Sequence, residues 1–481
     1  MANARLEEIR RVRLDKLDKL KKLGINPYPS KYSRELTSVS EAKSKIGTDL
    51  SVAGRVMHCR EHGNVVFMDL QDSSGKIQIL LQKKILTEQF PQVKLVDVGD
   101  FLGVTGTVIS TKAGETTVDV SSFTLLSKSL RPLPDDWFGL KDEEARYRQR
   151  YLDLLLDQKL GNLLRLKGTF WNSMRRFLLD AGFIEVETPV LETTPGGADA
   201  TPFVTHHEAL DIDLYLRISM GELWQKRLMV AGFDKTFEIG RQFRNEGLSR
   251  EHLQDYTQME FYWGYADFTD SMKLVEKMYK HVIQETFGTL KFSIHGYEVD
   301  FSQPWGVIDY QTIVKEKLEL DVLEATVEQL RLKLTGLHLP YTKGDSRGRL
   351  IDHLIKHIRK EISGPVFLTG HPVEVSPLAK RSTENPKKVE RYQIIIAGSE
   401  MGNGYSELND PVDQAERFAA QQELREKGDT EAQMFDHEFV TALEHGMPPV
   451  TGFGVSERLF SFLADKPIRE TVLFPLLRPE K

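Results

Sequence analysis

The residues Phe243–Tyr265 read FRNEGLSREHLQDYTQMEFYWGY, and this stretch governs the interpretation of the rest of the chain. It alternates charged with aromatic side chains, which makes it poor material for a hydrophobic core. Strand-forming residues flank a charged loop that contains Gly and Ser, so the pattern predicts strands at Thr236–Phe243 and Tyr256–Tyr265. We therefore expect a β-hairpin with charges near its tip.

The second predicted strand has two unlike faces, because successive side chains of a strand point to opposite sides. The polar face consists of Gln258, Glu260 and Tyr262. The apolar face consists of Met259, Phe261 and Trp263. Guanidinium and aromatic groups near the tip suit a nucleoside triphosphate, since arginine binds phosphate and a ring stacks on the base. Taken alone, the residues also allow a solvated hairpin held by ion pairs.

The order FRNEG and then YTQMEFY resembles motif 2 of the class II aminoacyl-tRNA synthetases, and the lysine-type enzymes in particular. The resemblance implies an α+β fold, with an antiparallel catalytic sheet flanked by helices and an N-terminal five-stranded β-barrel of the OB type. It also implies ATP-dependent activation of L-lysine and its transfer to tRNA(Lys). Mg²⁺ would be the cofactor, and the protein would be a homodimer.

Several short β-rich segments separated by turn residues follow one another in the N-terminal part, which fits a small barrel. They are Ser51–Met57, Val65–Leu70, Lys76–Leu81, Phe101–Ile109 and Thr116–Val120. The arrangement resembles the anticodon-binding barrel of the lysine, aspartate and asparagine enzymes.

On such a barrel, exposed rings stack on bases, each stacked base being worth ~1–3 kcal/mol. By its position in the resemblance, Phe67 would stack on an anticodon base, whereas a core position is the alternative for this ring. Gln78 and Glu115 would read a uridine-rich anticodon, and Arg55 would contact a phosphate.

With 481 residues, the chain is expected to hold two or more domains. Residues 1–49 would form a basic amphipathic helix and a connector, where the helix could contact RNA or present a solvated face. The barrel would occupy residues 50–128, a charged linker residues 129–153, and the catalytic domain residues 154–481. Residues from about 302 to 362 would be a helical insertion in the catalytic domain.

The net charge of −7 gives no overall attraction for nucleic acid, so any such site must be a local patch. Cys59 is the only cysteine, which excludes an internal disulfide and a cysteine-rich zinc site. No stretch has the length and hydrophobicity of a signal peptide or a membrane span. We expect a cytoplasmic protein without membrane contact.

The helical pattern of Leu160–Ala181 and the following FIEVETPVL resemble motif 1, which forms the dimer interface in this class. Periodicity alone shows only an amphipathic helix, whose apolar face could equally pack inside one chain. In the Pro195–Ala198 loop, Gly197 would lie over the amino acid. Glu222 matches the acidic residue that meets the α-ammonium group of the substrate.

The resemblance gives the nucleotide-binding residues specific roles. Arg244 would bridge the substrate carboxylate and the α-phosphate, and Glu246 would accept from the adenine amino group. Tyr256 would stack on adenine, while Arg250 and His252 would reach the outer phosphates.

Two further sequence features concern the same site. The family commonly reads Arg-His-Asn-Pro where this chain has Glu251-His252-Leu253-Gln254. The segment 447–458 resembles motif 3, and its Arg458 would bind the outer phosphates over the adenine face opposite Tyr256. Arg244 and Arg458 are the predicted catalytic residues.

The segment Tyr392–Arg417, YQIIIAGSEMGNGYSELNDPVDQAER, resembles the part of the lysine enzymes that selects the amino acid. Glu407 would bind the ε-ammonium group, with Glu260 and Tyr262 facing the same ligand. Asn403 would meet the carboxylate end of lysine, and Tyr405 would wall its aliphatic stem.

The predicted metal positions are Glu400 and Gln393. Lysine enzymes usually carry a glutamate at the position of Gln393, so only Glu400 remains as a charged ligand. Mg²⁺ typically takes one or two carboxylates together with phosphates and waters. The sequence therefore predicts weaker occupancy of accessory metal positions.

Three other functions remain open from the sequence. An aspartate or asparagine enzyme shares the architecture, but it should present a cation where Glu407 and Tyr262 stand. A ligase that attaches lysine to proteins would lack the barrel. A relative without catalysis would most simply have lost Arg244 or Arg458, and both are present.

Overall fold

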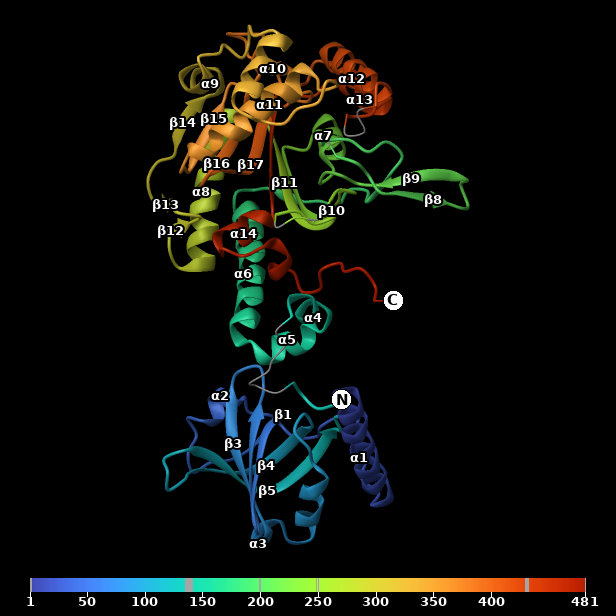
Figure 1. Ribbon diagram of the computed structural model, residues 1–481, viewed down its shortest axis with the longest axis vertical. Coiled ribbons are helices and arrows are strands. Elements are labelled where there is room, and N and C mark those ends of the chain that lie inside the picture. The colour runs from blue at the N-terminus through green and yellow to red at the C-terminus, as the bar shows by residue number, and fades with distance from the viewer. Residues whose placement is uncertain are drawn as a thin grey trace. The chain divides into compact units, whose positions relative to one another are not determined.

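The computed structural model describes residues 2–134, 142–198, 200–247, 249, 251–428 and 432–480. The chain divides into two units, residues 1–156 and 157–481, and each is considered by itself (Figure 1). Among the described helices, none combines the length and the apolar character needed to cross a membrane.

The first unit is built on a closed barrel with the strand order β1-β2-β3-β5-β4. Its strands are β1 (Asp49–His62), β2 (Val65–Gln71), β3 (Lys76–Gln82), β4 (Phe101–Ser110) and β5 (Thr116–Ser127). The barrel closes because β1 pairs with both β2 and β4, while β3 pairs in parallel with β5. Between β3 and β4 lie α3 (Lys83–Leu86) and a 3-10 helix (Thr87–Leu95). The predicted five-stranded OB-type barrel is confirmed.

Helix α1 (Ala2–Lys22) precedes the barrel, and two of its basic side chains make contacts within this unit. The buried Arg13 donates hydrogen bonds to the backbone carbonyls of Val98, Ser129 and Arg131. Lys16 forms an ion pair with Asp97 at 2.6 Å. These two cations therefore serve the packing of this unit, and the short helices α2 (Val39–Ala42), α4 (Glu143–Arg148) and α5 (Arg150–Leu156) complete it.

The second unit is built on an eight-stranded sheet with the order β14-β15-β16-β17-β18-β11-β10-β6. Its strands are β6 (Ile184–Glu185), β10 (Lys235–Phe243), β11 (Asp255–Gly264), β14 (Gly306–Asp309), β15 (Val366–Thr369), β16 (Arg391–Ile396), β17 (Ser399–Ser406) and β18 (Val450–Ser456). All pairings from β15 to β10 are antiparallel, as predicted. The edge strands are exceptions, because β14 pairs in parallel with β15 and β6 pairs in parallel with β10. The residue pattern of a strand does not show the direction of its neighbour.

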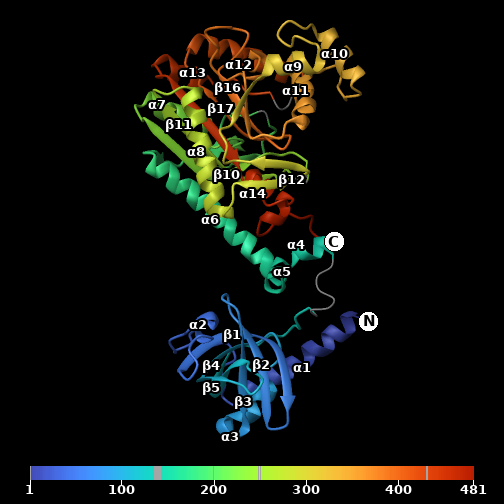
Figure 2. The same ribbon diagram turned by 90° about the vertical axis from the view of Figure 1, so that its left-hand side faces the viewer.

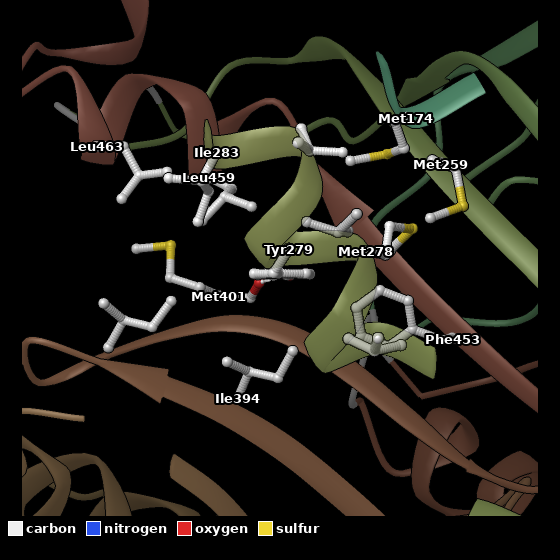
Figure 3. Close-up of a cluster of buried hydrophobic side chains, with 14 of the residues drawn as sticks. Met174, Met259, Met278, Tyr279, Ile283, Ile394, Met401, Phe453, Leu459 and Leu463 are labelled. Carbon is white, nitrogen blue, oxygen red and sulfur yellow. Dashed lines mark hydrogen bonds between the residues drawn. The ribbon is translucent and has the colours of Figure 1, made fainter. Parts of the chain in front are cut away.

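One face of this sheet is covered by α6 (Gln158–Asp180) and α8 (Phe268–Phe287), which lie side by side (Figure 2). Apolar side chains of both helices meet the apolar face of the hairpin, where Met259 and Phe261 are fully buried. Figure 3 shows Tyr279 of α8 within this core between Met401 and Phe453. The helix α14 (Arg458–Leu463) adds Leu459 and Leu463 to it.

Helices α7 (Glu222–Val230), α12 (Pro411–Glu426) and α13 (His437–Glu444) form a separate core that includes Tyr262, from the other face of β11. The expected helical insertion contains the helices α9 (Tyr310–Leu318) and α11 (Arg347–Ile358). It also contains α10 (Val327–Gly336) and the strand β14, which the sequence interpretation missed. These helices share a core with Leu368 and Ile395 of the sheet.

The remaining strands form two small sheets. One contains β7 (Leu191–Glu192), β8 (Val204–His207) and β9 (Ile212–Leu216), and the other contains β12 (Lys291–Ile294) and β13 (Tyr297–Asp300).

Candidate active site

The polar face of the hairpin lines a cavity of about 340 Å³ in the second unit. Residues of β11, β17 and β18 line it, together with Glu222 at the start of α7 and Gly197 and Ala198 of an earlier loop. The predicted site residues that line it are Gly197, Glu222, Arg244, His252, Tyr256, Glu260, Tyr262, Glu400, Asn403, Tyr405, Glu407 and Arg458. Residues from distant parts of the chain thus meet around one cavity.

Two predicted residues, Glu246 and Gln393, are not among the described residues that line the cavity. Glu246 is exposed to solvent, and Arg250 lies outside the described residues. Gln393 accepts a hydrogen bond from the ring of His371, with Nε2 and Oε1 3.2 Å apart. Burial lowers the pKa of His371 to about 3, with Arg391 adding to the effect, so this ring is neutral.

A chain of amide side chains orients the polar face of the hairpin. Gln242 donates to Oε1 of Gln258 at 2.9 Å and also bonds to the hydroxyl of Tyr256. Gln258 in turn donates to Oε1 of Glu260 at 2.5 Å. On the neighbouring strand, a Cβ at Gly454 would lie 3.1 Å from Cγ of Glu260, so glycine leaves room for this row.

Basic and aromatic groups gather at the end of the cavity nearest the hairpin tip. The guanidinium carbon of Arg244 lies 5.7 Å from the ring centroid of Tyr256. Arg458 forms an ion pair with Glu251. Burial lowers the pKa of His252, and the nearby charge of Arg458 lowers it further. This end presents cations and a ring, as a nucleotide requires.

Three carboxylates converge at the opposite end. The hydroxyl of Tyr262 donates to Oε2 of Glu260 at 3.2 Å, and the hydroxyl of Tyr405 bonds to Glu222. Burial raises the pKa of Glu260 to about 7, and the charge of Glu222 adds to this. Burial likewise raises the pKa of Glu407 to about 8. A cationic ligand would stabilise the ionised forms of these carboxylates.

Lys226 is a member of this end that the sequence interpretation missed. Its side chain is 1% exposed, and its ammonium lies 2.7 Å from Oε1 of Glu222 and 2.5 Å from Oε2 of Glu407. Burial lowers the pKa of Lys226, but the two carboxylates outweigh this and raise it overall. The spacing of Glu222 and Lys226, four residues apart in one helix, was the available signal, although such pairs are usually on the surface.

Arg391 was also missed. Its Nε donates to Oδ1 of Asn403 at 2.8 Å, and its NH1 donates to the carbonyl of Val375 at 2.6 Å. Arg391 therefore sets the orientation of Asn403. A lone arginine at the start of the apolar strand β16 was the available signal.

The wall beside Arg391 consists of Val375–Leu378, where a 3-10 helix (Val373–Val375) ends and a loop follows.

The donors available for a metal are few. Oε2 of Glu400 lies 3.5 Å from NH1 of Arg359, and the amide oxygen of Gln393 is used by His371. Across the part of the chain that the structure describes, no three His, Cys, Asp or Glu residues are grouped as metal ligands. The residues fit a Mg²⁺ held by Glu400 and nucleotide phosphates, but not one held by two protein carboxylates.

The barrel presents a second candidate site. Phe67 is half-buried on its outer face, between the buried Val66 and Met68, and so does not belong to the core. Gln78 lies nearby on β3, where it accepts a hydrogen bond from the hydroxyl of Thr117 at 2.9 Å.

Two predicted anticodon residues flank this face differently. Glu115 is exposed just before β5, and its carbonyl accepts a hydrogen bond from the same Thr117 hydroxyl. Arg55 pairs with Gln71, four residues along β2 from Phe67 and hence about 13 Å away. Its guanidinium donates to the carbonyl of Gly99 and stacks on Phe101. The structure thus places Gln78 near Phe67 and links Gln78 to Glu115 through Thr117, whereas Arg55 lies at the Gln71 end of β2.

Comparison with known proteins agrees with this geometry. Residues 142–478 match the family model described as tRNA synthetases class II (D, K and N), and residues 50–126 match the OB-fold nucleic acid binding domain. The lysine–tRNA ligases of Thermotoga sp. (strain RQ2) and Thermotoga maritima are each 44% identical to this chain, covering 99% of it and 97% of the relative. The lysine–tRNA ligase of Carboxydothermus hydrogenoformans is 43% identical, with complete coverage of both chains. The chain therefore belongs to the lysine–tRNA ligase family of the class II tRNA synthetases.

Proposed function

We propose that this protein activates L-lysine with ATP to form lysyl-adenylate and then transfers the lysyl group to the 3′ end of tRNA(Lys). The observation that supports this most is the polarity of one cavity. Arg244 and Arg458 stand at one end, and Glu222, Glu260 and Glu407 stand at the other. A cationic amino acid and an anionic nucleotide fit these two ends.

In the first step, a carboxylate oxygen of lysine attacks the α-phosphorus of ATP, and pyrophosphate leaves. Arg244 would lie between the two anions, offset their repulsion and stabilise the charge that develops on the phosphoryl oxygens. No side chain has to remove a proton, because the nucleophile is already ionised. In the second step, a terminal ribose hydroxyl of the tRNA attacks the adenylate carbonyl and AMP leaves.

The remaining predicted residues have matching positions. Tyr256 would stack on adenine, and His252 and Arg458 would approach the outer phosphates. Mg²⁺, when bound, would neutralise phosphate charge, with Glu400 as its protein carboxylate. Glu246 and Arg250 remain predictions for the adenine amino group and the phosphates.

The amino-acid end of the cavity explains the preference for lysine. Glu222 would bind the α-ammonium and Glu407 the ε-ammonium, with Glu260 and Tyr262 beside them and Tyr405 against the stem. A site built around buried polar groups rejects a ligand that leaves them unpaired by about 10⁴–10⁵-fold. Aspartate and asparagine offer no second cation for Glu407.

The central experiment is ATP–pyrophosphate exchange by the full chain with each of the twenty amino acids. Exchange should depend on lysine. Exchange supported by aspartate or asparagine but not by lysine would contradict the assignment.

We infer that residues 50–128 bind the anticodon and that residues 154–481 catalyse the reaction, with 129–153 as the linker. Protein synthesis takes place in the cytoplasm, and we place the protein there. Phe67, Gln78 and Glu115 would contact the anticodon bases, and Arg55 a phosphate further along the barrel.

Replacement of Phe67 tests the anticodon site. Phe67→Ala should raise the KM for tRNA(Lys) about 5- to 150-fold, since a stacked base is worth ~1–3 kcal/mol. Lysine-dependent exchange, which needs no tRNA, should be unchanged and serves as the internal control. An unchanged KM for tRNA with intact folding would remove Phe67 from the binding surface.

The ion pair between Glu251 and Arg458 has a consequence for ATP binding. Glu251 stands where relatives commonly carry arginine, and it holds the guanidinium that the phosphates would need. Glu251→Gln should lower the KM for ATP about two- to fivefold, the range for a partly exposed ion pair. Asp255→Asn, which breaks the nearby pair with Arg241, is the matched control. A KM for ATP that rises in Glu251→Gln would show that Glu251 assists binding instead.

A homodimer is proposed from the motif 1 resemblance and from exposed apolar side chains in the same region. Ile184, Val190 and Leu191 are all exposed in the single chain. Light scattering should give twice the chain mass of 55.0 kDa. Leu191→Arg should shift the mass toward that of one chain, whereas Leu332→Arg, at an exposed leucine of α10, should not.

A further inference from the structure

Lys226 connects two elements that hold opposite parts of the proposed lysine site. It lies on α7, one turn after Glu222, and reaches Glu407 directly after the end of β17. Its ammonium also lies 5.5 Å from the ring centroid of Tyr405 and 5.9 Å from that of Phe439. Lys226 is thus a fixed cation enclosed by two carboxylates and two rings.

Each of the two carboxylates, Glu222 and Glu407, turns one oxygen toward Lys226 and the other toward the cavity. Oε1 of Glu222 and Oε2 of Glu407 contact Lys226. Oε2 of Glu222 lies 3.0 Å from the place that a Cβ on Gly197 would occupy, and Oε1 of Glu407 lies against Gly452 in the same manner. Both glycines line the cavity. Lys226 therefore holds the carboxylates from behind while their other oxygens face the ligand.

The charges at this end favour a ligand with two ammonium groups. Glu222, Glu260 and Glu407 stand against one ammonium, so an excess of two negative charges remains when all are ionised. Buried charge without a partner is costly. A diamino acid whose ammonium groups match the spacing of the outward oxygens removes this excess.

We propose that Lys226 is a positioning residue that fixes the spacing between the α-ammonium and ε-ammonium subsites, and thereby selects lysine over shorter diamino acids such as ornithine. The inference rests on the proposed lysine site. Without the bridging cation, Glu222 and Glu407 repel each other and their spacing is no longer set. The loss of kcat/KM should then be smaller for a shorter diamino acid than for lysine.

The test compares lysine and ornithine as substrates of ATP–pyrophosphate exchange in wild type, Lys226→Met and Lys226→Gln. The ratio of kcat/KM for lysine to that for ornithine should fall at least about tenfold in Lys226→Met, the scale of one methylene in a fitted pocket. The KM for ATP should stay unchanged. Partial unfolding would lower kcat/KM for lysine and for ornithine by the same factor and leave their ratio constant. A change in the ratio therefore reports the positioning role of Lys226.

Lys128 provides a matched control. It is fully buried in the first unit and contacts Asp97 at 2.5 Å and Asp100 at 2.8 Å. Lys128→Met should lower the melting temperature but leave the lysine to ornithine ratio as in wild type.

The outcomes separate the two hypotheses. If Lys226→Met shows no cooperative melting, Lys226→Gln decides, because glutamine keeps an amide donor for folding but is one bond shorter and carries no charge to bridge Glu222 and Glu407. A wild-type ratio in a folded, active Lys226 variant overturns the role of Lys226. Absence of lysine-dependent exchange in wild type would instead overturn the proposed function.

Discussion

Arg244→Gln should reduce kcat for lysine-dependent ATP–pyrophosphate exchange by about 10²–10³-fold, the scale seen when a preorganised donor to a transition-state oxyanion is removed. Arg244 is the only residue here assigned to both substrates, because it would contact the lysine carboxylate and the α-phosphate. Those anions repel each other most strongly as they approach. The loss should therefore fall on kcat more than on either KM.

The nearby Arg241, on the strand β10 that ends just before Arg244, offers a control. It is exposed and pairs with Asp255 on β11, outside the cavity. Arg241→Gln should retain exchange within about twofold, as expected for an exposed ion pair. Pre-steady-state measurement of adenylate formation would separate the chemical step from release of products. Equal losses in both variants would remove the special role of Arg244.

The sequence predicted the hairpin well because its information is local. Two strands with period-two alternation determine which side chains share a face, so Gln258, Glu260 and Tyr262 could be placed together without a structure. The hairpin assignment needed only the order of residues along one strand. For Phe67 the sequence left a core position open, and the burial of Val66 and Met68 beside it shows that its ring faces outward from the barrel.

Contacts between distant segments were harder to predict. Nothing local to Lys226 shows that β17 brings Glu407 to it, and nothing local to Glu251 shows that Arg458 lies opposite. Family resemblance assigned roles to Glu407 and Arg458 one at a time, but it did not say which side chains hold them. The parallel pairing of the edge strands β6 and β14 could not be predicted either, because it also depends on segments that are distant in the sequence.

The departure at Gln393 gained a physical explanation. With a glutamine there, the neutral ring of His371 donates to an amide oxygen, and the buried pair carries no charge. A glutamate would place a carboxylate in that buried contact, which would favour a cation nearby. The lone carboxylate Glu400 and the nearby Arg359 are therefore a consistent set for this chain.

Glu407→Gln should raise the KM for lysine by about 10²–10³-fold, because truncating one partner of a buried charge pair costs about 2–5 kcal/mol. The KM for ATP should change little, since Glu407 stands at the far end of the cavity from Arg458. Glu192→Gln is the matched control, because Glu192 is also buried and burial likewise raises its pKa to about 7, but it lies outside this cavity.

The pH dependence gives a second, independent measurement on Glu407. Burial raises the pKa of Glu407 to about 8 although the ammonium of Lys226 opposes the shift, so protonation of this carboxyl competes with binding of lysine near neutral pH. Only the ionised form pairs with the ε-ammonium, and the KM for lysine in wild type should therefore fall as pH rises from 6.5 to about 8.5, by at most about tenfold per pH unit. Glutamine does not titrate, so the KM for lysine of Glu407→Gln should no longer fall with rising pH through this group. A slope that persists in the variant would assign the titration to another group, with Glu260 as the next candidate because its pKa is also raised, to about 7.

In the comparison of KM values, equal rises in the KM for lysine and the KM for ATP in Glu407→Gln would show that Glu407 supports the fold of the cavity and does not bind the ε-ammonium.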